Sequence, residues 1–294
     1  MKLSIKKLRI LCLFLIASSS INAQDFQGKV YYQSKTAIDM SAFGGNQMSE
    51  ERKKQIAERM KSMFEKTYVL SFNKSESNYK EDEVLAAPGQ GRGGRWGGMM
   101  SSFSAGPIYK NVKDNSFLQE QDFFGKLFLI KEELPEFEWK MGSETKQIGK
   151  YMCFKATTTH IVDNNTNSFG RRGRGRNNAN KATDSTNTEE VKAPSLTKEV
   201  EVTAWYTMQI PVSQGPGEFW GLPGLILEVN VENTTVYCSK IIMNPGEKAT
   251  IKAPTKGKEI TKDKYREVVR KKSEEMREMF RGGRGGSGRR GGGF

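Results

Sequence analysis

The stretch Trp220-Gly221-Leu222-Pro223-Gly224-Leu225-Ile226-Leu227-Glu228 says most about the fold of this chain. It continues into Val229-Asn230-Val231, where polar residues begin to alternate with apolar ones. A buried apolar run that passes into alternation is typical of a β-strand, so we expect a strand over residues 225–231. Proline presets φ for the first central position of a tight turn, and glycine supplies a positive φ at the second. Leu222–Leu225 is therefore predicted to be a type II turn with Gly224 at positive φ.

This turn admits two interpretations. It is a structural corner if Trp220 and Leu225 are anchored in the core, or the rim of a ligand site, since pockets are commonly lined by apolar and aromatic groups. We take the structural corner as the working hypothesis. The residues of this signature turn are Trp205, Tyr206, Trp220, Gly221, Leu222, Pro223, Gly224, Leu225 and Ile226.

Strand-like segments dominate the chain on both sides of the turn. They are rich in aromatic and β-branched residues, and no regular helices lie between them, which favours antiparallel pairing. A hairpin is expected over Val229–Met243, turning near Glu232-Asn233-Thr234. The other segments are Phe26–Thr36, Thr67–Glu76, Phe137–Met141, Lys146–Thr159 and Lys198–Met208, and Phe117–Leu134 contains several strand-like pieces.

Two amphipathic helices complete the predicted fold. Ser49 is a candidate N-cap for the first helix, and Thr261 begins the second, which ends before Gly282. The fold class is α+β, mainly β: one curved antiparallel sheet, as in an open half-barrel, with a helix after the first strand and a C-terminal helix. Both apolar stripes are expected to pack on the sheet. They comprise Ile56, Met60, Met63 and Phe64 in the first helix, and Tyr265, Val268, Val269, Met276, Met279 and Phe280 in the second.

The first 23 residues have the pattern of a secretory signal peptide. Basic residues precede the apolar run Ile10–Ala17, and a short stretch of small and polar residues ends before Gln24. The apolar run is too short to span a membrane. We therefore expect a cleaved export signal, a single domain over residues 24–280 with flexible loops near 86–106 and 164–195, and a disordered tail over 281–294. The mature protein would be periplasmic, associated with the outer membrane, or secreted.

The chain has 47 basic and 34 acidic side chains, and the basic excess is concentrated in Gly/Arg segments. In an exported protein, such segments suit anionic polymers or surfaces of the envelope in preference to cytosolic nucleic acid. The alternative is that they are tolerated low-complexity insertions. The arginines concerned are Arg92, Arg95, Arg171, Arg172, Arg174, Arg176, Arg281, Arg284, Arg289 and Arg290.

Two cysteines, Cys153 and Cys238, remain after the signal segment. An even pair in an exported protein predicts one disulfide, and the alternative is two buried free thiols.

Catalytic patterns are scarce. His160 is the only histidine, and no nucleophile motif accompanies it. The pairs Met60/Met63 and Met276/Met279 would suit Cu(I), but they coincide with the apolar stripes and are better interpreted as core residues. We assign no catalytic residue, cofactor or metal from the sequence.

Further residues extend the signature in both directions. They are Trp139, Glu144-Thr145-Lys146, Ile148-Gly149-Lys150-Tyr151 and Cys153-Phe154-Lys155-Ala156 upstream, and Ala204-Trp205-Tyr206 through Glu228 downstream. With the hexapeptide Gly221–Ile226, this pattern resembles the GLPGLI family of exported proteins of Gram-negative bacteria, to which no activity is assigned. The resemblance implies an envelope protein and leaves its biochemistry open. Residues 24–116 resemble the family only loosely.

Three functions from different classes fit these observations. The first is a non-enzymatic envelope protein that binds an apolar ligand, a peptide or a partner protein in the hollow of its sheet, which the 16 Phe, 9 Tyr and 4 Trp favour. The second is a surface-association module that contacts polyanions through the Gly/Arg segments. The third is an envelope hydrolase with an unrecognised site. An open concave face would favour the first, a filled face the second, and converging acids in a cleft the third.

Overall fold

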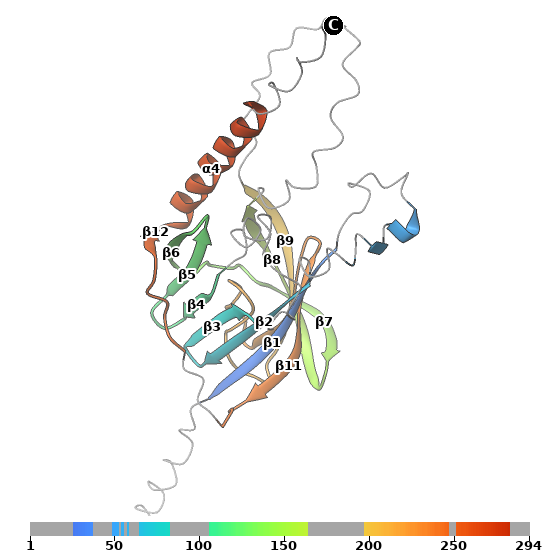
Figure 1. Cartoon of the computed structure of the whole chain (residues 1–294). Helices are drawn as coiled ribbons and strands as arrows, with labels where there is room; N and C mark the ends of the chain where they lie inside the picture. The colour runs from blue at the N-terminus through green and yellow to red at the C-terminus, as the bar shows by residue number, and fades with distance from the viewer. Residues whose placement is uncertain are drawn as a thin grey trace, which may run out of the picture.

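The structure of the protein is a computed structural model that describes residues 26–37, 49–52, 54–55, 58, 65–82, 106–163, 197–246 and 251–282. These residues form one 12-stranded sheet and a C-terminal helix, α4 (Lys262–Gly282) (Figure 1). The strands are β1 (Gln27–Thr36), β2 (Glu65–Asn73), β3 (Glu76–Glu81), β4 (Ile108–Asn111), β5 (Ser116–Phe123), β6 (Lys126–Glu133), β7 (Lys140–Ile148), β8 (Tyr151–Asp163), β9 (Thr197–Thr207), β10 (Leu225–Val231), β11 (Thr234–Met243) and β12 (Lys258–Ile260).

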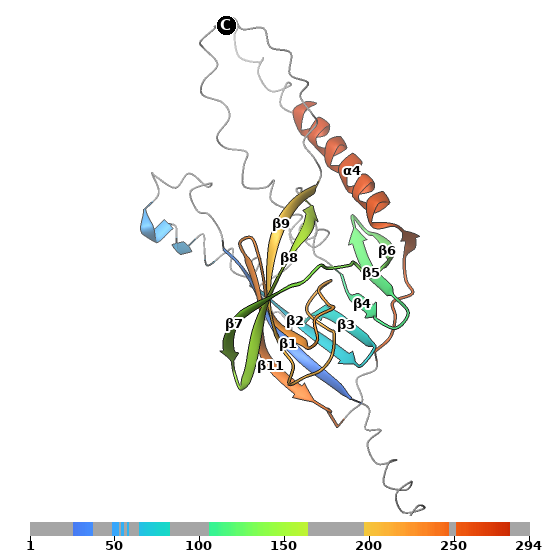
Figure 2. The same cartoon turned by 180° about the vertical axis from the view of Figure 1, so that it is seen from behind.

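The strand order is β12-β6-β5-β4-β3-β2-β1-β11-β10-β9-β8-β7. The ladders between these strands are antiparallel except the short one between β12 and β6, which is parallel. The sheet does not close, because β12 and β7 lie at opposite ends of the order. It twists and curls so that its two halves face one another (Figure 2). The predicted fold class, a mainly β chain with one open, curved antiparallel sheet, is therefore confirmed.

The early helix is also present. Residues 50–52, 54, 55 and 58 are helical, and Ser49 Oγ accepts a hydrogen bond of 3.4 Å from the backbone N–H of Arg52. This is the N-cap geometry that the sequence predicts. The apolar stripe of that helix, from Ile56 to Phe64, lies outside the described residues.

Two of the predicted strand segments contain a turn. Thr67–Glu76 was expected to be a single strand, but β2 ends at Asn73, whose side-chain oxygen accepts hydrogen bonds from the backbone N–H groups of Ser75 (2.9 Å) and Glu76 (2.6 Å). The chain reverses at this capped turn and continues as β3. Within Lys146–Thr159 the chain reverses at Gly149, whose φ is 59°. The predicted hairpin at residues 229–243 is confirmed, with Val231 opposite Thr234.

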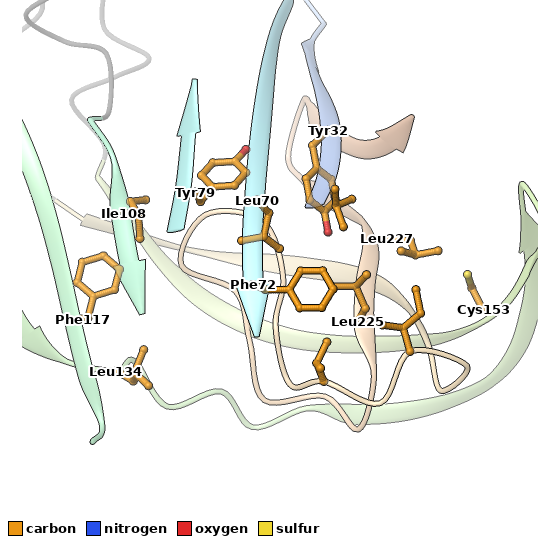
Figure 3. Packing of buried hydrophobic residues seen from close by; sticks show 13 residues of the cluster. Tyr32, Leu70, Phe72, Tyr79, Ile108, Phe117, Leu134, Cys153, Leu225 and Leu227 are labelled. Atoms are coloured by element: carbon orange, nitrogen blue, oxygen red, sulfur yellow. The ribbon is translucent and has the colours of Figure 1, made fainter. Parts of the chain in front are cut away.

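The core lies between the two halves of the curled sheet. Tyr32, Leu70 and Phe72 point inward from β1 and β2 toward Leu225 and Leu227 of β10 (Figure 3). All five side chains are fully buried, and each contributes about 1.5–3 kcal/mol by leaving water. The predicted strand at 225–231 is thus the inner wall of this core.

Helix α4 extends away from the body and does not cover the sheet (Figures 1 and 2). Its first turn packs on the β5–β6 hairpin, where the ring of Tyr265 lies 6.0 Å from Phe123 and 5.6 Å from Phe128. Farther along, Met276 is half-buried and Met279 is 66% exposed. The interpretation of these methionines as core residues is therefore wrong, because the helix leaves the sheet after Tyr265.

Candidate functional site

The signature segment folds into the hollow of the sheet. We define the signature loop as residues 208–224, which connect β9 to β10. Two backbone hydrogen bonds fold it back on itself, from Leu225 N–H to the Ile210 carbonyl (2.9 Å) and from Ile226 N–H to the Gln214 carbonyl (3.0 Å). Leu222 of the loop is fully buried, as is the start of β10. The Tyr32 hydroxyl on β1 donates a 2.6 Å hydrogen bond to the Ile226 carbonyl. The signature therefore fills the concave face.

The type II turn at Leu222–Leu225 is not observed, because Gly224 does not have a positive φ. The left-handed glycines of the loop are Gly217 (φ 60°) and Gly221 (φ 94°). Gly224 is required for a different reason: a Cβ built on it would lie 2.1 Å from the backbone oxygen of Thr207. The loop therefore passes so close to the end of β9 that only glycine fits there.

Trp139 and Trp220 hold the outer side of the signature loop. The indole N–H of Trp139 donates a 2.9 Å hydrogen bond to the Trp220 carbonyl, and the indole N–H of Trp220 donates one of 2.8 Å to the Pro135 carbonyl. The ring of Phe137 lies 5.5 Å from both Trp139 and Phe219. Trp220 is thus anchored against the core, as predicted, although its side chain is only partly buried.

Trp205 and Tyr206 are neighbours on β9 and therefore point to opposite faces of the sheet. Tyr206 is buried in the core, near Leu222 and Ile226. Above the ring of Trp205, at 4.6 Å from its centroid, lies the Lys146 ammonium group, which also forms a 2.7 Å ion pair with Glu228. Trp205 and Tyr206 thus belong to the part of the sheet that surrounds the signature loop.

A buried lysine holds the signature loop from beneath. Lys110 of β4 is fully buried, and its ammonium group donates hydrogen bonds to the carbonyl oxygens of Gly215 (2.9 Å) and Phe219 (2.8 Å). Beside it in the β3–β4 ladder, Ser77 donates a 2.7 Å hydrogen bond to the side-chain oxygen of Gln214. Burial lowers the pKa of Lys110 to about 7, against the opposing effect of Glu218. Sequence reasoning missed this residue, because nothing in the short Ile108–Asn111 segment indicates that it is buried.

Glu218, in the middle of the signature loop, belongs to a partly buried ionic cluster that joins the loop to β8 and α4. Glu218 accepts a 2.9 Å hydrogen bond from Lys262 at the start of α4 and lies 2.9 Å from His160 Nε2 on β8. Burial opposes the ionisation of Glu218, but the His160 hydrogen bond and the Lys262 charge outweigh it and lower the pKa of Glu218 to about 2. The rings of Phe137 and Phe219 flank His160 at 5.4 and 5.6 Å. We call Glu218, His160 and Lys262 the ionic junction.

The ionic junction does not have the layout of a hydrolytic site. Within the described residues, the hydrogen-bond partner of His160 is a carboxylate, and no hydroxyl or thiol group is bonded to its ring. The carboxylate is already engaged by His160 and Lys262. No group of three or more His, Cys, Asp or Glu side chains that could hold a metal ion is found in the described part of the chain. Among the described residues, Glu218 thus connects the signature loop to β8 through His160 and to α4 through Lys262.

The predicted disulfide is not formed: Cys153 and Cys238 are free thiols. Cys153 is on β8 and Cys238 on β11, with β9 and β10 between them in the sheet. Burial raises the pKa of Cys153 to about 11 and that of Cys238 to about 12. Both side chains pack into the same core cluster. The alternative of two free thiols therefore describes this structure, with Cys153 buried and Cys238 partly buried.

The Gly/Arg segments lie almost entirely outside the described residues, which end within α4 at Gly282. Arg92, Arg95 and the group from Arg171 to Arg176 are among the undescribed residues, as are the predicted signal peptide and the loops near 86–106 and 164–195, apart from Gly106. Among the helical residues that can be described, none forms a segment long and apolar enough to cross a membrane.

Comparison with known proteins finds distant structural likeness and a family model that matches part of the chain. Two solved structures of PNGF-II are similar to this chain at 14% identity, with TM-scores of 0.43 and 0.44. Each comparison covers 83% of this chain and only 32% or 33% of the other, so the chain spans about a third of those structures. No curated protein matches the sequence. The family model described as "Protein of unknown function (Porph_ging)" matches residues 139–228, which begin at Trp139 and end with the signature at Glu228.

Proposed function

We propose that this protein is a non-enzymatic envelope protein that associates with a polyanionic surface through a basic arm at its C-terminus. We define the basic arm as α4 together with the basic tail, residues 281–294. The observation that carries the proposal is a contrast between the sheet and α4. The signature loop fills the hollow of the sheet, whereas α4 extends away from the body.

The filled hollow counts against a ligand site there. Leu222, Leu225, Ile226 and Leu227 are all fully buried at the centre of the concave face. In the loop, the carbonyl groups of Gly215 and Phe219 accept hydrogen bonds from Lys110. At the start of β10, the carbonyl group of Ile226 accepts one from Tyr32. The signature thus uses its apolar and polar groups for folding, which favours a contact surface on the outside of the protein.

Ion pairs between its own side chains stabilise α4 where it extends beyond the sheet. Four ion pairs one turn apart link its side chains: Asp263–Arg266, Glu267–Lys271, Arg270–Glu274 and Lys272–Glu275. Each such pair stabilises a helix by about 0.2–0.5 kcal/mol. At about 1.5 Å per residue, the 21 residues of α4 extend over about 30 Å. The helix is therefore long enough to act as a spacer between the body and the sequence that follows Gly282.

The charges of the tail suit a polyanion. Arg281, Arg284, Arg289 and Arg290 occur in a stretch of 14 residues that contains no acidic side chain. Arginine binds phosphate and carboxylate groups through paired N–H donors, and the attraction weakens with salt. In an exported protein the available polyanions are lipopolysaccharide phosphates, acidic polysaccharides, anionic lipids and released DNA.

The experiment compares two variants of equal net charge in the chain that starts at Gln24. In the first, Arg281, Arg284, Arg289 and Arg290 are changed to Gln; in the control, the exposed body lysines Lys74, Lys80, Lys113 and Lys140 are changed to Gln. The tail variant should elute from a phosphate-bearing resin at much lower salt than the parent, and the control should elute close to the parent. Equal losses in both variants would show that retention follows net charge alone and would overturn the proposal.

A further inference from the structure

We propose that the polyanionic surface is an anionic lipid membrane, into which an apolar surface formed by α4 and the neighbouring β5–β6 hairpin inserts. This inference rests on the proposed function and specifies which class of polyanion the protein contacts. We define the apolar shoulder as Phe124 and Leu127 at the tip of the β5–β6 hairpin, together with Val268, Val269, Met276 and Met279 of α4.

The apolar shoulder is accessible to solvent. Phe124 is 36%, Leu127 38% and Met279 66% exposed, and Val268, Val269 and Met276 are half-buried. On a helix, residues 265, 268, 269, 276 and 279 lie within one stripe, because they recur at spacings of three, four, seven and eleven. The first residue of this stripe, Tyr265, packs on the body, and the rest of the same stripe continues past the edge of the sheet.

Ring contacts through the buried Phe123 join the hairpin tip to the first turn of α4. The ring of Phe123 lies 4.8 Å from Phe124 in an edge-on arrangement and 6.0 Å from Tyr265. Both views of the molecule place the tip of the β5–β6 hairpin beside the base of α4 (Figures 1 and 2). The exposed ring of Phe124 is therefore joined to the stripe of α4 through Phe123 and Tyr265.

The backbone conformation at position 124 is unfavourable for phenylalanine, so the stability of the turn does not explain why a phenylalanine is found there. Phe124 and Gly125 are the two central residues of the hairpin turn, and both have positive φ (51° and 73°). Turns of this kind favour Asn-Gly, and a bulky residue in the left-handed region costs about 1 kcal/mol. An exposed phenyl ring at the tip is unfavourable for the isolated protein and favourable once the ring enters an apolar phase.

The charge around the shoulder selects lipid over a second copy of the chain. The segment 262–282 has eight basic and five acidic residues, and the tail beyond it adds Arg284, Arg289 and Arg290. Two such arms would repel each other, whereas anionic headgroups attract them. A soluble polyanion would satisfy the charges but leave the apolar stripe in water. An apolar stripe beside basic side chains fits the boundary between lipid headgroups and acyl chains.

Flotation with vesicles tests the inference in the full chain from Gln24, with zwitterionic vesicles as the reference and vesicles containing phosphatidylglycerol as the probe. The variant combines Phe124→Asn, which places a residue suited to positive φ in the turn, with Met279→Ser. The control combines Met141→Ser and Met152→Ser, two exposed methionines of β7 and β8. Loss of two inserted apolar side chains should weaken binding to anionic vesicles at least tenfold. The control should bind like the parent, and all proteins should elute alike from the phosphate-bearing resin.

The outcomes separate the two proposals. Retention on the resin without binding to anionic vesicles would overturn the lipid inference and leave the polyanion proposal standing. Absence of binding to both would overturn both. Equal vesicle binding by the parent and the Phe124→Asn/Met279→Ser variant would show that the shoulder does not insert. A parent dimer that dissociates in this variant would assign the shoulder to a second copy of the chain and overturn the lipid inference.

Discussion

The side-chain nitrogen of Lys110 lies 2.9 Å from the carbonyl oxygen of Gly215. A strand in one half of the sheet is thus hydrogen-bonded to the signature loop, which belongs to the other half. Lys110 is on β4 and the loop connects β9 to β10, and five strands lie between β4 and β9 in the sheet order. The same ammonium group donates to the Phe219 carbonyl. This buried lysine therefore links the two sides of the core through its hydrogen bonds.

The burial of Lys110 predicts that the free energy of unfolding depends on pH in a specific way. The pKa of Lys110 is about 7 in the folded protein and near its ordinary value of 10.5 in the unfolded chain. Between these values the unfolded state binds more protons, so the free energy of unfolding rises with pH. For Lys110→Met this contribution is absent. Urea unfolding between about pH 7 and pH 10 should show the parent gaining about 1 kcal/mol per pH unit relative to the variant. Parallel pH profiles would contradict the assignment.

The ionic junction predicts a loss of stability in acid. Because the pKa of Glu218 is lowered to about 2, its ionised form stabilises the fold above the ordinary pKa of 4.5, and this stabilisation is lost as the pH falls through about 2. Glu218→Gln should lower the free energy of unfolding by about 1–3 kcal/mol near neutral pH, and by much less near pH 2.

A matched control for Glu218 is Glu144→Gln. Glu144 pairs with Lys155 at 2.7 Å, but its side chain is 64% exposed. Removal of such an exposed pair should change the free energy of unfolding by less than about 0.5 kcal/mol. Equal effects of the two substitutions would mean that the junction with His160 and Lys262 contributes no more than a surface ion pair.

The free thiols predict slow chemistry in the native protein. Burial raises the pKa of Cys153 and Cys238, so little thiolate is present near neutral pH, and access is restricted as well. Iodoacetamide at about pH 8 should label both residues rapidly in urea and far more slowly in the folded protein. Peptide mapping without reductant that recovered a linked Cys153–Cys238 peptide would contradict the structure.

Much of the fold follows from local patterns. The strand at 225–231, the hairpin that reaches Met243 and the helix after Thr261 each rest on the spacing of apolar residues and on nearby turn or cap residues. Such signals do not depend on the rest of the chain. The turn at Asn73 was missed because its signal is a side-chain oxygen that caps two N–H groups inside a run that otherwise resembles a strand.

The long-range features could not be predicted in the same way. Lys110 is buried only because β4 lies under a loop more than 100 residues away, and its own segment carries no sign of this. The ionic junction joins Glu218 to His160 and to Lys262, which lie 58 and 44 residues away from it in the sequence. For Gly224 the residue type was recognised as essential, but the reason is the backbone of Thr207 at close range, which only the folded sheet reveals.

The structural role of the signature loop is tested most directly by a glycine replacement that separates folding from binding. In Gly224→Ala the new methyl group would meet the backbone of Thr207, whereas Gly246→Ala meets nothing within 4 Å. Thermal and urea unfolding should show Gly224→Ala destabilised by about 1–3 kcal/mol and Gly246→Ala close to the parent. Folded Gly224→Ala should still elute from the phosphate-bearing resin at the salt concentration of the parent. If Gly224→Ala instead melts like the parent but is no longer retained, the signature is itself the binding surface, and its assignment as a structural element that fills the sheet is wrong.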